Sequence, residues 1–216
     1  MDRSKIPNLD AGFGNDFQNP LGWRKQFVEN HDKLEGWMEA QCQAALYNMA
    51  KLCAPESHVV EIGAYKGLST VHVAAGRKVV NAKNSIYVID PFCDAEDKGG
   101  TGNKSYFKQD FINNVERCGL TYEVIIVEGL SNHLHGWIGT KCGGNIELLF
   151  IDGDHTYDGV KRDYNLYYPM VKVGGLIAFH DSGFEGIAKA LAEIKAEGNC
   201  SLVQEICSMS IFYKDK

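Results

Sequence analysis

At residues 61–70 the chain reads EIGAYKGLST, and this stretch decides the fold because it joins an apolar strand to a helix. Gly63 and Gly67 bracket the turn between them, and glycine there lets a ligand approach the backbone closely. Ser69 or Thr70 can cap the helix, whose N-terminal amides favour a carboxylate or a phosphate. The stretch therefore predicts a turn that binds a ligand.

Apolar strands alternate with helical segments on both sides of this turn. The strand-like segments are 58–63, 85–90, 123–128, 146–152 and 176–180, and the helical segments are 34–52, 69–79, 107–117, 157–170 and 184–197. Such alternation is typical of an α/β fold with a largely parallel sheet covered on both faces. Two further strand-like runs, 201–207 and 209–214, almost touch, which forces a hairpin. We therefore predict a doubly wound, mostly parallel seven-stranded sheet with an antiparallel C-terminal hairpin, a Rossmann-like architecture.

The composition is that of a globular protein. Hydrophobic residues make up 44% and charged residues 23% of 216, which excludes disorder over most of the chain. We find no apolar stretch of membrane-spanning length and no secretory signal, so we expect a cytoplasmic protein. A net charge of −6 argues against a nucleic acid or an anionic membrane as partner. Seven cysteines without a C-x-x-C pair fit reduced, mostly buried thiols.

Residues 1–33 differ from the rest of the chain, because they are rich in Asn, Asp and Gly. We predict an irregular arm whose aromatic rings pack on a domain that covers residues 34–216. Those rings are Phe13, Phe17, Trp23 and Phe27. The sequence leaves open whether the arm is a lid over a site or an ordinary extension. The loop 93–104, an insertion rich in Gly, Asp and Lys, is a second segment that we expect to shape a binding pocket.

An acid stands at each of two strand ends near the glycine turn. Ligands in an open α/β sheet bind outside the carboxyl ends of the strands. Glu61 lies two residues before the first glycine, where it would repel a pyrophosphate but attract an ammonium or a sulfonium. Asp90 ends the next strand and can accept hydrogen bonds from both hydroxyls of a ribose. The two acids together therefore suit an adenosine that carries a positively charged tail with a carboxylate. S-adenosylmethionine has this structure.

The stretch at 61–70 resembles motif I of class I S-adenosylmethionine-dependent methyltransferases. Its E-x-G-A-Y-x-G-x-S form is similar to the branch that resembles catechol O-methyltransferase, and the terminal hairpin matches that fold as well. The similarity covers residues 34–214. It implies that Glu61 and Gly63 border the methionine part of the cofactor, and that Tyr65 and Ser69 lie near its carboxylate. The other cofactor-binding residues that it implies are Gly67 in the same loop, Asp90 at the ribose, Leu130 and Ser131 beside the adenine, and Asp152.

Acids and histidines end the next two strands of the predicted sheet. The chain reads DGDHTY at 152–157 and FHDS at 179–182, and these strands are neighbours in this topology. Two acids and two histidines should therefore converge beside the methyl donor, and carboxylates with an imidazole suit a divalent cation. Ligation mostly by oxygen favours magnesium or manganese, and an imidazole ligand moves the preference toward manganese or a later metal.

The resemblance to catechol-type and macrolide-sugar O-methyltransferases assigns roles within this cluster. It implies that Asp152 is a metal ligand, that His155 is the general base, and that the adjacent pair His180 and Asp181 completes the metal site. The pair departs from the family pattern, since its first member is normally acidic. The residues alone leave simpler roles open: Asp154 and Asp181 can cap the helices that follow them, and His180 can bond a backbone carbonyl.

These patterns together predict an enzyme that moves a methyl group from S-adenosylmethionine to a hydroxyl of a small molecule. The acceptor is a sugar, a catechol-like compound or another natural product, and Tyr65, Phe92, Trp23 and Phe184 are candidates for the walls of its pocket. The alternatives are a metal-free O- or N-methyltransferase, an NAD-dependent oxidoreductase and a cofactor-binding protein without catalysis. Dimers are common for the fold by analogy, so a homodimer also stays open.

Overall fold

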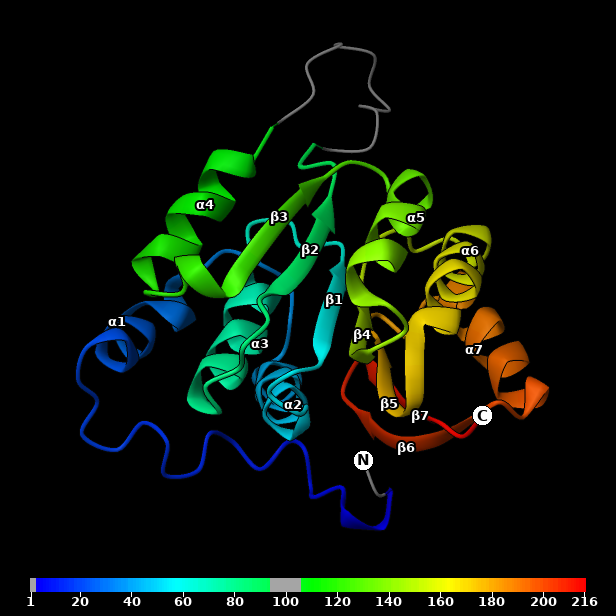
Figure 1. Cartoon of the computed structure of the whole chain (residues 1–216), viewed down its shortest axis with the longest axis horizontal. Coiled ribbons are helices and arrows are strands. Elements are labelled where there is room, and N and C mark those ends of the chain that lie inside the picture. The colour runs from blue at the N-terminus through cyan, green and yellow to red at the C-terminus, as the bar shows by residue number, and fades with distance from the viewer. Residues whose placement is uncertain (1–2, 94–105) are drawn as a thin grey trace.

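A seven-stranded sheet forms the centre of the protein, and the computed structural model describes residues 3–93 and 106–216 (Figure 1). Its strands are β1 (His58–Ile62), β2 (Ile86–Asp90), β3 (Val124–Glu128), β4 (Ile146–Ile151), β5 (Val171–Phe179), β6 (Cys200–Ile206) and β7 (Met209–Lys214). They lie in the order β3-β2-β1-β4-β5-β7-β6. The strands β1 to β5 pair in parallel, whereas β7 is antiparallel to both β5 and β6. The predicted fold class and the C-terminal hairpin are confirmed.

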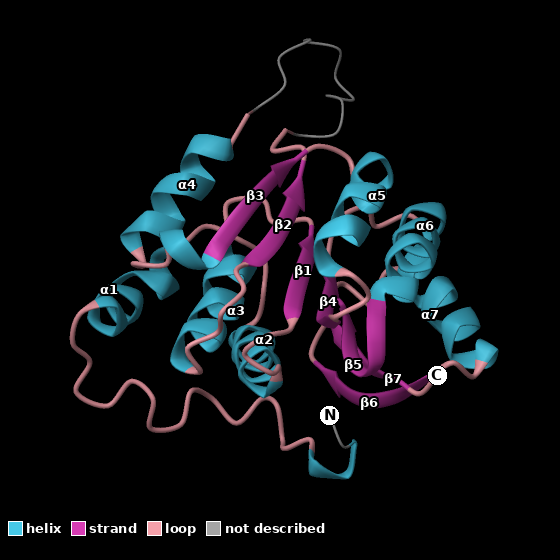
Figure 2. Ribbon diagram, viewed as in Figure 1, coloured by secondary structure: helices cyan, strands magenta, loops and turns pink. Residues whose placement is uncertain are grey.

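Helices cover both faces of this sheet (Figure 2). They are α1 (Trp23–Asn30), α2 (Ala40–Leu52), α3 (Leu68–Val79), α4 (Lys108–Arg117), α5 (Ser131–Cys142), α6 (Tyr157–Tyr167) and α7 (Glu185–Glu197). Successive strand residues point to opposite faces, so Val59 belongs to the core under α1 to α4, and Val60 to the core under α5 to α7. Burial on both faces explains why the central strands read as unbroken apolar runs.

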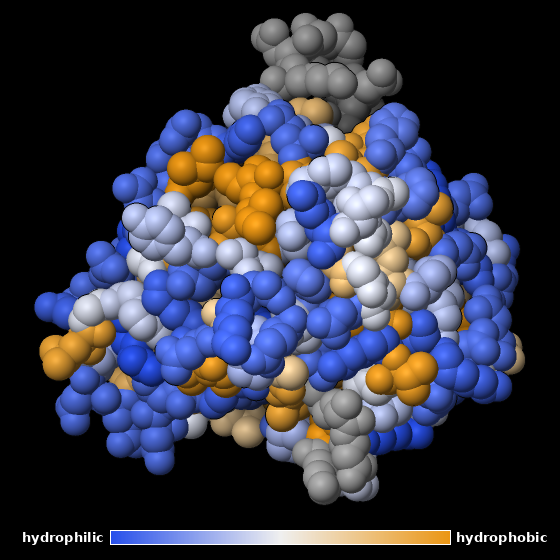
Figure 3. All heavy atoms as spheres, viewed as in Figure 1, coloured by the Kyte–Doolittle hydropathy of each residue, from blue (hydrophilic) through white to orange (hydrophobic). Residues whose placement is uncertain are grey.

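The edge of the sheet at β3 is less covered than its centre. Every residue of β2 and β4 is buried, whereas only Val127 is buried in β3. On the viewed face, Figure 3 shows hydrophobic side chains gathered over β2 and β3.

No helix in the described part of the chain is both long enough and apolar enough to cross a membrane.

The N-terminal arm packs by its aromatic rings, as the sequence predicts, but it is not irregular throughout. The Phe13 ring lies 5.1 Å from that of Tyr47 in α2 and stacks 5.8 Å from His72 in α3, by ring centroids. Phe17 stacks on Phe27, whose centroid is 4.9 Å away. Phe27 belongs to α1, a helix that the composition of the arm does not suggest.

The main differences from the prediction are the starts of two elements and one additional helix. The helix predicted from residue 34 begins at Ala40, and β5 begins at Val171, upstream of the predicted residue 176. The helix α5 is absent from the prediction, because Gly136 and Gly139 interrupt a segment with few apolar residues. The residues of the predicted loop 93–104 beyond Cys93 lie outside the described residues.

Candidate active site

The ends of β1 and β4 approach so closely that residue 63 has to be glycine. Gly63 has a φ of +85°, and a Cβ atom built on it would lie 2.2 Å from the carbonyl oxygen of Asp152. The Asp152 amide donates a hydrogen bond to the carbonyl of Ile62 at 2.8 Å, which holds the two strand ends side by side. The glycine turn and the first predicted metal ligand therefore share one edge of the sheet, as expected for parallel strands.

Glu61 lies beneath the glycine turn and is 0% exposed. It accepts hydrogen bonds from the Ser69 hydroxyl and, at 2.7 Å, from the Thr70 hydroxyl. These two side chains therefore tie α3 to β1, and no side chain caps the helix at Gly67. Burial raises the pKa of Glu61 to about 8, although the two hydroxyls act in the opposite direction.

Asp90 holds the glycine turn from the neighbouring strand. One carboxylate oxygen accepts hydrogen bonds from the amides of Ala64 and Tyr65, at 2.7 and 3.0 Å. The other oxygen accepts one from the Phe92 amide at 2.5 Å. Burial raises the pKa of Asp90, while these backbone bonds lower it. A carboxylate offers about four acceptor positions, so roughly one is left for a ribose hydroxyl.

Two adjoining cavities lie along these strand ends. The larger has a volume of about 910 Å³, and the smaller about 170 Å³. Predicted site residues in the larger cavity are Gly63, Tyr65, Asp90, Leu130, Ser131, Asp152 and His155. Those in the smaller one are Gly63, Tyr65, Ser69, Asp152, His155, His180 and Asp181. Glu61 and Gly67 line neither cavity, and neither do the described residues of the arm.

Asp152, His155 and Asp181 form a cluster where the two cavities meet. One ligand atom from each lies within 4.8 Å of the others, and His155 Nε2 is 3.3 Å from an Asp181 oxygen and 3.7 Å from an Asp152 oxygen. The nearby Asp152 carboxylate raises the pKa of His155, against a smaller effect of burial. Two carboxylates with one imidazole are a donor set that fits a divalent cation of the manganese type.

His180 is only 3% exposed and adjoins this cluster, with its Nδ1 3.5 Å from an Asp181 oxygen. Its Nδ1 is 3.2 Å from Asp152 Oδ1, and its Nε2 is 3.0 Å from the Ser208 hydroxyl. Burial alone would lower the pKa of His180, but hydrogen bonds to Asp152 and Cys42, and the charges of Asp152 and Asp181, raise it to about 10. Its ring nitrogens bond side chains rather than the backbone carbonyl that the residues alone left open.

The two capping roles have different outcomes. Asp154 accepts a hydrogen bond from the Thr156 amide at 2.9 Å, at the start of α6, although Thr156 is the capping residue itself. Asp181 does not cap α7, where no side-chain cap is present at Phe184. Asp181 instead has a φ of +52°, in the left-handed region that ordinary residues rarely adopt. Such strain is concentrated at functional sites.

Two exposed aromatic rings lie near the cluster: Trp37 lines the smaller cavity, whereas Phe184 lines neither cavity and contacts His155. Trp37 is 78% exposed and stacks on Tyr65, with the ring centroids 5.1 Å apart. Phe184 is 53% exposed, and its centroid lies 5.6 Å from that of His155. Sequence reasoning did not predict Trp37 as a site residue, because its helical spacing suggested a position in the core. Its place just before the start of a helix was the one signal that it could lie in a loop. Phe92, in contrast, is fully buried.

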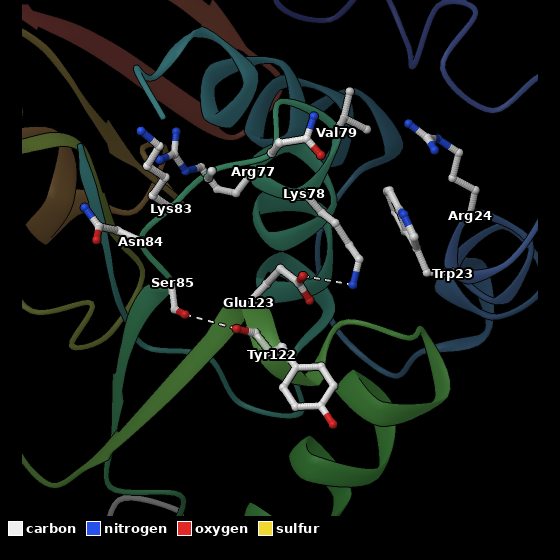
Figure 4. A pocket seen from close by; sticks show the side chains of 12 residues that line it. Trp23, Arg24, Arg77, Lys78, Val79, Lys83, Asn84, Ser85, Tyr122 and Glu123 are labelled. Atoms are coloured by element: carbon white, nitrogen blue, oxygen red, sulfur yellow. Dashed lines mark hydrogen bonds and ion pairs between the residues drawn. The ribbon is translucent and has the colours of Figure 1, made fainter. Parts of the chain in front are cut away.

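Trp23 lies in a separate hollow of about 600 Å³ at the amino ends of β2 and β3 (Figure 4). Trp23, a candidate wall of the acceptor pocket by sequence, therefore lines neither of the two cavities at the strand ends. Within this hollow Lys78 pairs with Glu123 at 2.8 Å, while the buried Arg77 donates to backbone carbonyls such as that of Cys53. These charged groups hold the fold together, and we assign the hollow no chemical role.

The site and the fold agree with what the sequence matches among known families. Residues 60–182 match a family described as "Methyltransferase domain", and this is more than half of the chain. The protein belongs to this family. An uncharacterized protein of Acanthamoeba polyphaga mimivirus is 33% identical over 123 residues, which are 56% of this chain and 50% of that protein. The chain thus spans about half the length of that curated relative.

Several solved structures share this fold over most of the chain. Rv0187 from MTB, solved with its cofactor, has a TM-score of 0.65 at 16% identity, over 98% of each chain. An O-methyltransferase from Bacillus cereus in complex with SAH has a TM-score of 0.64 at 16% identity, over 99% of this chain and 100% of that one. CalS11, a TDP-rhamnose 3'-O-methyltransferase, has a TM-score of 0.57 at 18% identity, over 80% of this chain and 76% of that one. At such identities the likeness shows the class I methyltransferase fold alone.

Proposed function

We propose that the protein transfers the methyl group of S-adenosylmethionine to a hydroxyl of a small molecule that carries two adjacent oxygens. The observation that carries this proposal is the cluster of Asp152, His155 and Asp181 at the junction of two cavities. A cavity of about 910 Å³ is large enough for the nucleoside, and the cavity of about 170 Å³ beside it suits part of a sugar or a catechol ring.

The cofactor would lie along the larger cavity. We propose that Asp90 accepts a hydrogen bond from the ribose, and that Leu130 and Ser131 flank the adenine. The Ser131 hydroxyl also donates to Asp163 at 2.5 Å, which fixes its position. Ser69 lies at the first turn of α3, where backbone amides favour the carboxylate of the methionine part. The negative carboxylates of Asp90 and Asp152 favour a positively charged sulfonium nearby.

The acceptor hydroxyl would lie beside His155, and its oxygen would then attack the methyl group in an in-line nucleophilic displacement. The oxygen forms a bond to the methyl carbon while the carbon–sulfur bond breaks, and its electron pair stays on sulfur to give S-adenosylhomocysteine. His155 Nε2 takes the hydroxyl proton, which requires the neutral imidazole. A divalent cation held by Asp152 and Asp181 would lower the pKa of the hydroxyl and orient its two oxygens.

Two of the solved relatives support this choice by what they bind or modify. The Bacillus cereus O-methyltransferase is in complex with SAH, which is the product of the proposed reaction. CalS11 is a TDP-rhamnose 3'-O-methyltransferase, and rhamnose carries a vicinal diol. We therefore rank sugars and catechol-like compounds first among the acceptors.

The test begins with binding and ends with turnover. Calorimetry with S-adenosylhomocysteine and with NAD should show heat for the first ligand only, and the reverse result would contradict the cofactor assignment. Radiolabelled methyl transfer to a panel of sugar and catechol acceptors should then respond to Mn²⁺ and be lost in excess chelator. A binding protein without catalysis would give heat but no transfer.

A metal-free methyltransferase is the second candidate, and one observation favours it. His155 is close enough to Asp181 for the carboxylate to stabilise the imidazolium, so the pair could work as a base without a metal. Transfer that persists in excess chelator but is lost in His155→Ala would select this candidate.

A further inference from the structure

Two hydrogen bonds from α6 hold the start of α5 at the larger cavity. The Ser131 hydroxyl donates to Asp163 Oδ1 at 2.5 Å, and the Tyr167 hydroxyl donates to the Ser131 carbonyl at 2.8 Å. Asp163 and Tyr167 are four residues apart in α6, so they project from the same face of that helix. One helix face therefore fixes both the side chain and the backbone of Ser131.

Asp163 is a buried carboxylate with one oxygen in use. Its side chain is only 2% exposed, and both Asp163 and Ser131 line the larger cavity. Oδ1 accepts the bond from Ser131, and Arg162 Nε lies 3.9 Å from the same atom, which is too far for a hydrogen bond. The other oxygen, Oδ2, accepts no hydrogen bond from any residue that the structure describes. Burial raises the pKa of Asp163, whereas the Ser131 hydroxyl and the Arg162 charge lower it.

The free oxygen calls for a ligand with a hydrogen to donate, because a buried carboxylate oxygen without a donor is costly. The Ser131 hydroxyl adds a second acceptor beside it. A hydroxyl has one hydrogen, which Ser131 donates to Asp163, so only its lone pairs remain for a ligand. Two neighbouring acceptors favour an N–H group in the cavity and repel a carbonyl oxygen in the same place.

Apolar surface adjoins these two acceptors. A Cβ atom built on Gly153 would lie 3.4 Å from the Ile62 side chain and 3.8 Å from Asp163 Oδ2, so Gly153 lies directly against both. Leu130, which precedes Ser131, lines the same cavity and is 53% exposed. A few polar groups between apolar walls are typical of a small-molecule site, and here they suit a flat heterocyclic ring with an amine at its edge.

We propose that Asp163 is a specificity-determining residue, whose free oxygen accepts a hydrogen bond from the exocyclic amine of the adenine, with Ser131 as its support. The proposal rests on the proposed function, which puts the adenine beside Ser131. The sequence motifs assign no role to Asp163. A hydrogen bond to a charged acceptor contributes about 10- to 100-fold in affinity, and a site built around such a bond rejects an analogue that lacks the donor.

The test compares S-adenosylhomocysteine with S-inosylhomocysteine, which carries a carbonyl oxygen in place of the exocyclic amine. Calorimetry gives the affinity of each nucleoside for the same protein, so the test needs neither a methyl acceptor nor a metal. Asp163→Asn keeps the size of the side chain. The asparagine carbonyl would accept the bond from Ser131, which leaves the NH₂ group at the place of Oδ2. The substitution therefore exchanges an acceptor for a donor.

We expect the wild type to bind S-adenosylhomocysteine about 10- to 100-fold more tightly than S-inosylhomocysteine. Asp163→Asn should reverse this preference, because the new amide can donate to a carbonyl oxygen but not accept from an amine. Ser131→Ala should weaken S-adenosylhomocysteine binding by about 3- to 10-fold and keep the preference. Two controls should match the wild type. They are Asp158→Asn, an exposed position in the first turn of α6, and Ser201→Ala, whose hydroxyl donates to Asp215 at 2.5 Å in β6.

Equal affinity of the wild type for the two nucleosides would overturn the proposal, and this comparison decides the matter even if a thermal melt shows that Asp163→Asn does not fold. A folded Asp163→Asn variant that loses affinity for both nucleosides by the same factor would overturn it too, because a structural role has that pattern. Failure of the proposed function looks different: the wild type would then bind neither nucleoside.

Discussion

Replacement of Gly63 by alanine should destabilise the protein strongly, because the new methyl group would meet backbone and not a movable side chain. The three nearest atoms are the Asp152 oxygen at 2.2 Å, the Asp152 carbonyl carbon at 2.5 Å and Gly153 Cα at 2.7 Å. The φ of +85° adds strain for any residue with a Cβ.

The size of the effect follows from these two causes. Left-handed strain costs about 1–3 kcal/mol and forced overpacking about 1–3 kcal/mol, which gives about 4 kcal/mol for Gly63→Ala. For a chain of this size that loss should lower Tm by roughly 8–16 °C in a calorimetric or fluorescence melt.

The matched control is Gly136→Ala. Gly136 lies inside α5, and a Cβ there would meet nothing within 4 Å. Alanine in a helix interior should gain about 0.5–1 kcal/mol, so Tm should rise slightly. If Gly63→Ala melts at the wild-type temperature, the close approach of β1 and β4 is refuted, and with it the placement of Asp152 beside the glycine turn.

Three further predictions concern the site. His155→Ala should lower kcat by about 10²–10⁴ while the affinity for S-adenosylhomocysteine stays the same. In the wild type, kcat should fall as pH decreases through the raised pKa of His155, because the imidazolium cannot accept a proton. A pH–rate profile in which kcat falls only on the alkaline side would contradict the role of His155 as general base. Burial raises the pKa of Glu61 to about 8 in the folded state. Between about pH 4.5 and 8 the folded state therefore keeps a proton that the unfolded state releases, so the free energy of unfolding should decline as pH rises through this range. Chemical denaturation of Glu61→Gln should lack this decline; equal pH dependence in both proteins would rule the explanation out. Trp37→Ala should raise the KM of the acceptor and not that of the cofactor, because the exposed ring borders only the smaller cavity; an altered cofactor KM would place Trp37 elsewhere.

Local sequence is sufficient to predict the sheet and which residues meet at the carboxyl ends of its strands. Strand ends in a parallel sheet meet at one edge, so the positions of Gly63, Asp90 and Asp152 along the chain are enough to place them together. The same reasoning could not place Glu61, because a strand residue next to the turn can face either side of the sheet. The structure puts it under the turn, where it holds Ser69 and Thr70.

Long-range partners are beyond the reach of sequence patterns. Ser208 and Glu39 are 169 positions apart, and nothing in either local segment indicates that they meet. The helix α5 was missed for another reason: its intrinsic preference is weak, and its stability comes from packing Ile138 and Cys142 on the sheet. Trp37 was misplaced because helical spacing continues upstream of the residue where the helix begins.

The tight turn at Cys207 and Ser208 joins the last two strands, and a connection of this kind ordinarily tolerates extra residues. Here the Ser208 carbonyl and hydroxyl are both bonded to other segments, and Cys207 has a φ of +49°. Lengthening this turn by even one residue would move the serine out of register with β5. A library of random insertions should therefore be depleted at this hairpin tip, and circular permutants opened there should be inactive even when they fold.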